Sequence, residues 1–404
     1  MISTAMEARN PHKKTETETE TVALEPQKKM ETKADIDDVL TLCLIESEIL
    51  TRLPAKSVGR FKCVCKQWKS FLSTPTFVRT HLHYHRTIND HKLLLADGAT
   101  LRKVPFTDTI PSNPNPNPSG AHAKVLLLLA SLDGLVLLAS ITQEGPTELV
   151  FLNPLTGAFR KLSPFFEPDP NDIFGFAHFY DVMGFYKDDS CNDYKLVYLI
   201  AGGDLGAYIY SHRLDTWREI DSSFAFRKTE TNSGFCIWSP ATLFGQCLYF
   251  IVKAYYLRIK KHNSWVMCFD VKTETFRKIQ FPPFPDAGSK PYYGSLVLLN
   301  GHLHLYLSYC MDYLTHRDLW RMNGDGDDGW VKVAAYPPSS DEGWHHIRTA
   351  TAGNWVAVMD QENNSFTKLN TEDFTTNYRY FRSTSMKHLY SQMIYVETLV
   401  SPNL

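Results

Sequence analysis

The spacing of apolar residues changes once along the chain, from a helical period to the pattern of β-strands. Between residues 39 and 72, apolar side chains recur about every three to four positions, as on one face of an α-helix. Leu53 and Pro54 interrupt this stretch, because proline cannot continue a helix, and Ser57 can then cap a second one. The pattern predicts a small helical unit, which we delimit as residues 38–83.

The remaining chain, residues 88–402, consists of short runs of Val, Ile, Leu, Tyr and Phe separated by Gly, Asn, Asp and Pro. Such runs are typical of β-strands joined by tight turns. Five segments repeat one order: an apolar run, an Asp or Asn turn, an aromatic residue and a closing aliphatic residue. We expect each aromatic residue to pack between neighbouring sheets. These residues lie about 36 to 59 positions apart and are Phe159, Trp217, Phe276, Trp330 and Phe366.

A four-stranded unit that recurs at such an interval is typical of a β-propeller. The five repeats account for five blades. Pairing of residues 91–95 with residues 393–400 would complete a sixth blade and close the ring without a free edge. The sequence therefore predicts a mainly β fold, with a β-propeller-like domain of about six blades after a small all-α unit. An irregular β-sandwich is the alternative, because the repeats are unevenly spaced.

The amino-acid composition indicates what kind of partner the chain binds and in which compartment it works. Residues 1–37 are rich in Lys, Glu and Thr, which predicts a disordered arm. With 42 basic and 44 acidic residues the net charge is −2, so bulk charge favours a protein partner over nucleic acid or a membrane. The longest apolar run, residues 125–132, is shorter than the roughly 20 residues that cross a bilayer. Because the eight cysteines lack the spacing of a disulfide framework, we expect a cytoplasmic or nuclear protein.

The helical region carries a resemblance to a known family. Residues 49–68, in which Leu53 and Pro54 precede a helix and a tryptophan, closely resemble the F-box of plant F-box proteins. The start departs from the family, because its usual Leu-Pro pair falls on Thr41 and Leu42, and this could weaken adaptor binding. In such families the box binds a Skp-type adaptor and, through it, a cullin scaffold. The matching adaptor-binding positions are Ile49, Leu50, Leu53, Pro54, Val58, Phe61, Val64, Cys65 and Trp68.

The β region is similar to the F-box-associated interaction domain that follows such boxes in plants. The matching stretches are residues 132–136, 153–157, 184–197, 269–270, 318–320 and 395–400. Together the two resemblances cover about residues 38–402. They imply a substrate receptor of an SCF-type ubiquitin ligase, in which the propeller holds an unknown protein target for ubiquitination by a separate enzyme.

Two other functions stay open beside this one. The chain could be a non-ligase scaffold or sequestering protein with a degenerate F-box, or an enzyme built on the propeller. The enzyme would need an acid, base or metal cluster, and we expect no catalytic group, metal or cofactor. The substrate-binding residues are unknown, although rim loops such as residues 165–179, 224–238 and 339–346 are candidates.

Several motifs match the sequence of a catalytic or metal-binding site, but the other residues that such a site requires are missing. Residues 316–323 match the kinase pattern H-R-D-L-x-x-x-N, but a glycine loop upstream and a following D-F-G are missing. The acidic turn after them lacks the Gly and Glu of a calcium loop. The histidines of residues 81–85 and 345–346 have no neighbouring ligand to complete a zinc site. We expect a blade strand and a solvated turn, and we expect Cys63 and Cys65 to be packing groups.

Overall fold

The computed structural model describes most of the chain beyond its first 43 residues. The predicted disordered arm, residues 1–37, and the atypical start of the box, Thr41 and Leu42, lie outside the described residues. The chain forms two units, Met1–Ile49 and Leu50–Leu404, and each is described by itself. The predicted domain limits stay predictions. The described residues are 44–87, 91–97, 100–105, 125–141, 148–163, 182–200, 206–221, 234–256, 261–282, 293–311, 314–323, 329–339, 347–352, 355–360, 365–370, 376–380 and 391–403.

The helical part consists of short elements. The first unit contributes η1 (Ile45–Ile49), and the second begins with η2 (Leu50–Arg52), α2 (Ala55–Phe61), α3 (Lys66–Phe71) and α4 (Pro75–Thr87). The predicted cap at Ser57 is wrong, because Pro54 takes the N-cap position of α2. The Pro54 carbonyl accepts hydrogen bonds from the amides of Ser57 and Val58, at 2.8 and 3.1 Å.

The second predicted helix is divided into α2 and α3. The chain leaves the helix after Phe61, and Cys65 restarts it, because its Sγ accepts a hydrogen bond from the Trp68 amide at 3.4 Å. The expectation that Cys63 and Cys65 are packing groups is wrong. Both side chains are exposed, and the thiol of Cys63 makes a local contact of 3.9 Å with the Gly59 carbonyl.

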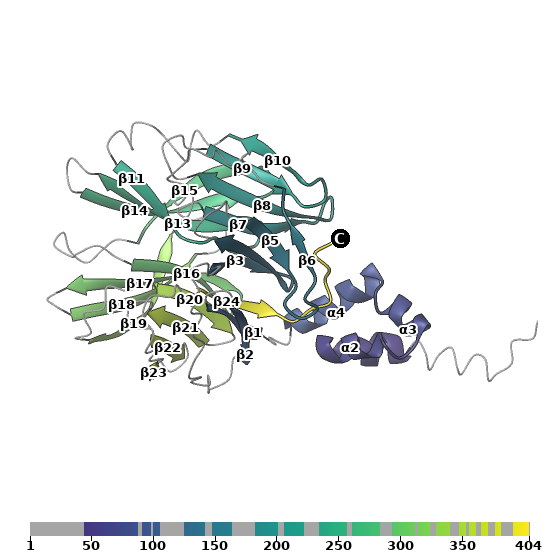
Figure 1. Cartoon of the computed structure of the whole chain (residues 1–404). Coiled ribbons are helices and arrows are strands. Elements are labelled where there is room, and N and C mark those ends of the chain that lie inside the picture. Colours follow the sequence, from purple (N-terminus) through teal and green to yellow (C-terminus); the bar gives the residue numbers. More distant parts are fainter. Residues whose placement is uncertain are drawn as a thin grey trace, which may run out of the picture. The chain divides into compact units, whose positions relative to one another are not determined.

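Six sheets make up the rest of the described residues (Figure 1). Four of them have four strands in chain order. The first contains β3 (Val125–Leu132), β4 (Leu135–Ile141), β5 (Glu148–Leu152) and β6 (Phe159–Lys161). The second contains β7 (Val182–Asp188), β8 (Asp193–Ile200), β9 (Gly206–Ser211) and β10 (Thr216–Ile220). The third contains β16 (Tyr293–Leu299), β17 (His302–Met311), β18 (Leu314–Met322) and β19 (Trp330–Ser339). The fourth contains β20 (Ile347–Ala352), β21 (Trp355–Asp360), β22 (Ser365–Asn370) and β23 (Thr376–Tyr380).

Two sheets depart from the four-stranded form. One contains β11 (Gly234–Trp238), β12 (Thr242–Phe244), β13 (Cys247–Tyr256), β14 (Lys261–Asp270) and β15 (Thr275–Gln280). Here β11 and β12 pair with opposite ends of the long β13, and Pro240, which has no amide donor, lies between them. The other contains β2 (Thr100–Pro105), β1 (His91–Asp97) and β24 (Ser391–Val396).

The predicted fold class is confirmed, with a correction to the blades. Neighbouring sheets contact one another in chain order through β3, β7, β13, β16 and β20, and the last of these strands contacts β24. The sheets therefore form a closed propeller-like ring. The prediction of about six blades is too high for regular four-stranded blades, because only four of the six sheets in the described residues have that form.

In three of the five repeats the aromatic residue links neighbouring sheets, as predicted. The indole of Trp217 donates to the carbonyl of Ser163 in the preceding blade at 3.0 Å. The indole of Trp330 donates in the same way to Gln280 at 2.9 Å. Phe276 is buried in the core that joins two blades. Phe159 contradicts the expectation, since it is 58% exposed, and the side chain of Phe366 is outside the described set.

The ring closes between segments that are far apart in sequence. β24 pairs antiparallel with β1, so that His91 lies opposite Val396, which confirms the pairing predicted from sequence (Figure 1). The segment after β24 then crosses to the first four-stranded blade. There the Thr398 hydroxyl donates to the Asp133 carbonyl at 2.7 Å. The side-chain amide of Asn153 donates to the carbonyls of Thr398 and Val400, at 3.0 and 2.7 Å.

Candidate functional site

Two of the residues predicted to contact an adaptor are buried in the chain itself. Leu50 is 2% exposed and Val58 is fully buried, so both belong to the core of the helical part. In this conformation neither side chain can reach a partner. A helical period alone could not reveal this, because in such a small unit the same period marks the internal core and a partner-binding face.

The remaining predicted residues are accessible to different degrees. Ile49, in the first unit, is 53% exposed. In the second unit, Leu53 is half-buried. The other five define what we call the α2–α3 surface. Three of its residues are exposed, among them Val64 at 65%, and two are half-buried. The α2–α3 surface consists of Pro54, Val64 and Cys65 together with the half-buried Phe61 and Trp68.

Phe61 and Trp68, the two half-buried residues of this surface, contact each other. Their rings pack edge to face, with centroids 5.5 Å apart. Such aromatic pairs contribute about 1 kcal/mol beyond the area that they bury. Each ring therefore has an internal role, and its uncovered part remains accessible.

The start of α2 is held against α4 by two histidines. The Nε2 atoms of His81 and His85 both lie 2.9 Å from the carbonyl oxygen of Leu53, and the two rings stack with centroids 4.3 Å apart. A carbonyl oxygen only accepts hydrogen bonds, so each Nε2 must carry a proton. The two side chains thus fix the residue that precedes Pro54, which is a structural role.

Acid is expected to destabilise this arrangement through His81. Burial lowers the pKa of His81 from its ordinary 6.5 to about 4. A second proton would go to Nδ1, which is buried and has no hydrogen-bond partner within the described residues. The unfolded chain therefore binds this proton at a higher pH than the folded chain. Stability present above pH 6.5 should be lost as the pH falls toward 4, by about 3 kcal/mol.

The measurement is the free energy of unfolding in urea, followed from about pH 7.5 to about pH 4.5. His81→Gln keeps an N–H donor but does not titrate, so its curve should be flatter than that of the wild type. His83→Gln is the matched control, because His83 is exposed on the same helix. Equal pH dependence of the wild type and His81→Gln would contradict the role given to His81.

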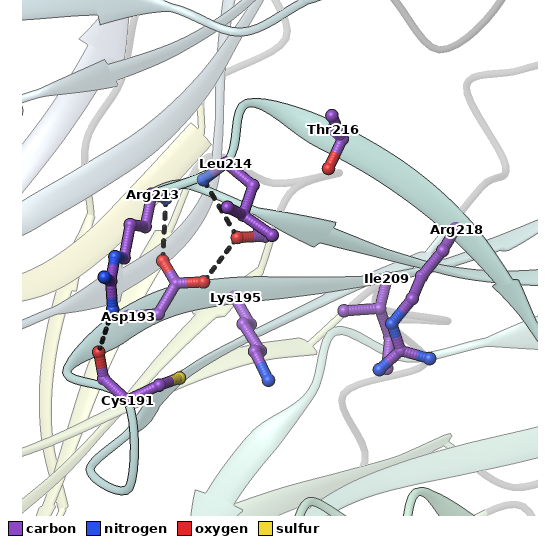
Figure 2. A pocket seen from close by; sticks show the side chains of 9 residues that line it. Cys191, Asp193, Lys195, Ile209, Arg213, Leu214, Thr216 and Arg218 are labelled. Carbon is purple, nitrogen blue, oxygen red and sulfur yellow. Dashed lines mark hydrogen bonds between the residues drawn. The ribbon is translucent and has the colours of Figure 1, made fainter. Parts of the chain in front are cut away.

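A pocket in the described part of the propeller can be compared with a catalytic site. It has a volume of about 200 Å³ and lies on the blade of β7 to β10 (Figure 2). Figure 2 shows Arg213 reaching back to the carbonyl of Cys191, at 3.3 Å. The carboxylate of Asp193 accepts from the Ser211 hydroxyl at 2.5 Å and from the Arg213 amide at 2.8 Å. Asp193 is thus engaged in holding the turn between β9 and β10.

The charged groups around this pocket are paired. Lys195 lies 2.6 Å from Asp188, and hydrogen bonds from Lys195 and Ser190 hold the pKa of Asp188 well below its usual range. Arg218 bonds to Glu274 of the next blade. Ligand pockets are usually larger, at about 300–1,000 Å³. The charged groups that line the pocket therefore hold the blade of β7 to β10 together and, through Arg218, join it to the next blade.

The motifs that match catalytic or metal-binding sequences have structural roles in the part of the chain that the structure describes. His316 and Asp318 lie on β18, as expected for a blade strand. Asp318 is buried and accepts from the Tyr309 hydroxyl at 3.0 Å, and Lys332 lies 2.8 Å from it. Most of the acidic turn and the pair His345 and His346 lie outside the described residues. Within the described part, no group of three or more His, Cys, Asp or Glu could hold a metal ion.

Two further expectations concern regions of the chain as a whole. Among the helices that the structure describes, none is both long and apolar enough to span a membrane. The candidate rim loops, residues 165–179 and 340–346, lie outside the described residues, as does most of residues 224–238. The site that the described residues support best is therefore the α2–α3 surface.

Comparisons with protein families agree with this division of the chain. Residues 46–80 match the model of the F-box domain. Residues 109–401 match the model described as the F-box associated beta propeller domain. The first match contains the α2–α3 surface, and the second contains the strands from β3 to β24 but not β1 and β2.

Similar proteins come from Arabidopsis thaliana. F-box protein CPR1 is 26% identical over 333 residues, which cover 75% of this chain and 75% of that protein. F-box protein At1g67130 is 29% identical over 245 residues, which cover 57% of this chain and 49% of that protein. The chain thus spans between half and three quarters of the length of these relatives.

A solved structure also aligns with much of the chain. A chain from the crystal structure of a nidogen/laminin complex is 11% identical and has a TM-score of 0.43. The alignment covers 76% of this chain and 99% of that one. At this TM-score the likeness carries no argument about function.

Proposed function

Because the chain belongs to the family of proteins with an F-box-associated β-propeller domain, we propose that it is the substrate-recognition subunit of an SCF-type ubiquitin ligase. The F-box docks a Skp-type adaptor, which connects the chain to a cullin scaffold. The propeller holds a target protein, and a separate enzyme transfers ubiquitin to it. In this proposal the chain has no catalytic group of its own and works in the cytoplasm or the nucleus.

The observation that carries the proposal is the exposed apolar part of the F-box match. Val64 is 65% exposed at the turn between α2 and α3, and Pro54 is exposed at the start of α2. Exposed apolar groups that gather on a small unit are typical of a protein-binding surface. Covering a side chain such as Val64 contributes about 1.5–3 kcal/mol, which an adaptor can supply.

The propeller half of the proposal rests on rigidity. The blades are joined by buried cores and by cross-blade hydrogen bonds such as that from Trp217 to Ser163. A rigid frame of this kind presents its connecting loops in fixed positions, and binding residues are common on such loops. The proposal leaves the identity of the target open.

One feature favours a second function. The family's usual Leu-Pro pair is Thr41 and Leu42 in this chain, so the proline that normally begins the box is missing. If this weakens docking, the chain could act as a scaffold that binds its target without delivering it to a ligase.

A two-stage pull-down separates the two functions. The full chain is co-expressed with a Skp-type adaptor, and then with adaptor, cullin and RING protein together. For a ligase receptor, the chain should retain the adaptor and recruit the cullin through it. Retention of neither protein would contradict the proposed function. Retention of the adaptor without the cullin would favour the scaffold.

A further inference from the structure

Residues 50–87, which contain η2, α2, α3 and α4 and begin just after Glu46 and Glu48 of η1, are far more basic than the rest of the chain. Residues 50–87 contain no Asp or Glu, whereas the remaining residues carry 34 basic and 44 acidic side chains. A chain that is nearly neutral overall therefore concentrates its positive charge on one small region. The eight basic residues of this region are Arg52, Lys56, Arg60, Lys62, Lys66, Lys69, Arg79 and Arg86.

Four of these cations lie on the two helices that bear the α2–α3 surface. Lys56 and Arg60 are four positions apart on α2, and Lys66 and Lys69 are three apart on α3, so each pair lies on one side of its helix. All four are exposed. Within the described residues, none of them forms an ion pair. We call these four residues the basic face.

Keeping these charges together has a cost in stability. Like charges four positions apart on a helix destabilise it by a few tenths of a kcal/mol. Lys62, between the two helices, is half-buried, and this burial lowers its pKa. An acidic residue at any one exposed position among residues 50–87 would relieve the repulsion, yet this stretch contains none. An anionic partner would turn this cost into attraction.

The composition of the surroundings favours a protein as that partner. The exposed Val64 lies between the cations of α2 and those of α3 in the sequence, and the half-buried Trp68 lies between the two cations of α3. A surface that mixes apolar groups with charge matches a protein face with acidic residues around an apolar centre. A long nucleic acid or a membrane would extend beyond this small region and meet the acidic remainder of the chain.

We propose that the basic face binds an acidic surface of the Skp-type adaptor and accelerates its association with the chain. This inference rests on the proposed function and adds the charge of the partner surface to it. Opposite charges around an interface act mainly on the association rate, because they steer the approach of the two proteins. Salt screens this attraction over about 10 Å at 0.1 M, so the association rate should fall as salt rises.

Charge reversal on the intact chain tests the inference. Lys56→Glu with Arg60→Glu is compared with Lys272→Glu with Arg321→Glu, a matched pair of reversals at exposed propeller cations that form no ion pair within the described residues. Association and dissociation rates with a recombinant Skp-type adaptor are measured from about 50 mM to about 500 mM salt. The first pair should lower the association rate about tenfold or more at low salt, flatten its salt dependence and leave dissociation nearly unchanged. The propeller pair should behave as the wild type.

The outcomes distinguish this inference from the proposed function. Lys66→Glu with Lys69→Glu provides an independent second variant on α3, and circular dichroism checks the folding of each variant. Adaptor binding that is insensitive to salt and to both reversals overturns the basic face but leaves the proposed function intact. Absence of adaptor binding by the wild type overturns both. Binding to phosphatidylserine vesicles or duplex DNA that is tighter than to the adaptor, and is lost on reversal, overturns the choice of a protein partner.

Discussion

A chain in which Leu53 and Pro54 are both replaced by alanine is expected to lose capture of a Skp-type adaptor. Pro54 is exposed at the N-cap of α2, and Leu53 is the half-buried residue whose carbonyl His81 and His85 hold. Truncation removes apolar contact area from both. It also removes the ring that restricts the backbone at the start of α2. Central apolar residues of an interface each contribute about 2 kcal/mol or more, so affinity should fall about 1,000-fold.

The control for this variant is a second Leu and Pro pair. Leu214 is 70% exposed in the turn between β9 and β10, and Pro240 is exposed between β11 and β12. Leu214→Ala with Pro240→Ala should retain the adaptor at the level of the wild type. Co-purification and a binding isotherm provide the measurement, with the helical content of each variant checked by circular dichroism. Undiminished capture by the Leu53 and Pro54 variant would contradict the assignment of the docking surface.

The second large effect is expected at the closure of the ring. Gly134 has a φ of +78°, and a Cβ placed on it would lie 2.5 Å from the Val396 carbonyl and 2.4 Å from the Thr398 hydroxyl. Gly134→Ala must therefore displace the segment after β24, with loss of the bonds from Thr398 and Asn153. Alanine in this backbone region costs about 1–2 kcal/mol, and each lost buried bond costs about 1 kcal/mol more. We expect a loss of about 4 kcal/mol in the free energy of unfolding.

Gly301 supplies a matched control for Gly134. It occupies the same position of the turn between β16 and β17, with a φ of +74°, but a Cβ there would meet no atom within 4 Å. Gly301→Ala should cost only the backbone part, about 1 kcal/mol. Urea unfolding gives both values, and limited proteolysis should release the segment after β24 in Gly134→Ala alone. Equal losses in the two variants would refute the role of this contact.

The sequence predicted the features that repeat. The turn and aromatic pattern located the strands around Trp217, Phe276 and Trp330, and the pairing of the first and last strands followed from the need to protect sheet edges. The pattern overestimated the number of regular blades, because Pro240 divides one strand into β11 and β12 without changing the apolar period. The spacing of apolar residues in the sequence is the same whether a sheet has one long strand or two short strands in its place.

Long-range roles of turn residues were beyond the sequence pattern. Asn153 was predicted as a local turn residue, and its Oδ1 does accept from the Leu155 amide at 2.8 Å. Its Nδ2 also anchors the segment that follows β24, a partner about 250 positions away. Local propensity describes only the first of these bonds. The same limit applies to Val58, whose burial depends on the tertiary packing of the helical part.

The pairing of β1 with β24 also has a consequence for synthesis on the ribosome. His91 and Val396 lie opposite each other but are about 300 residues apart, and translation at about 5–20 residues per second separates them by roughly 15–60 s. Without β24, a hairpin of β1 and β2 would leave the other edge of β1 unpaired. Nascent or prematurely terminated chains that lack β24 would expose this edge to other strands, which makes them substrates for chaperones and proteases. Completion of translation is thus coupled to closure of the ring.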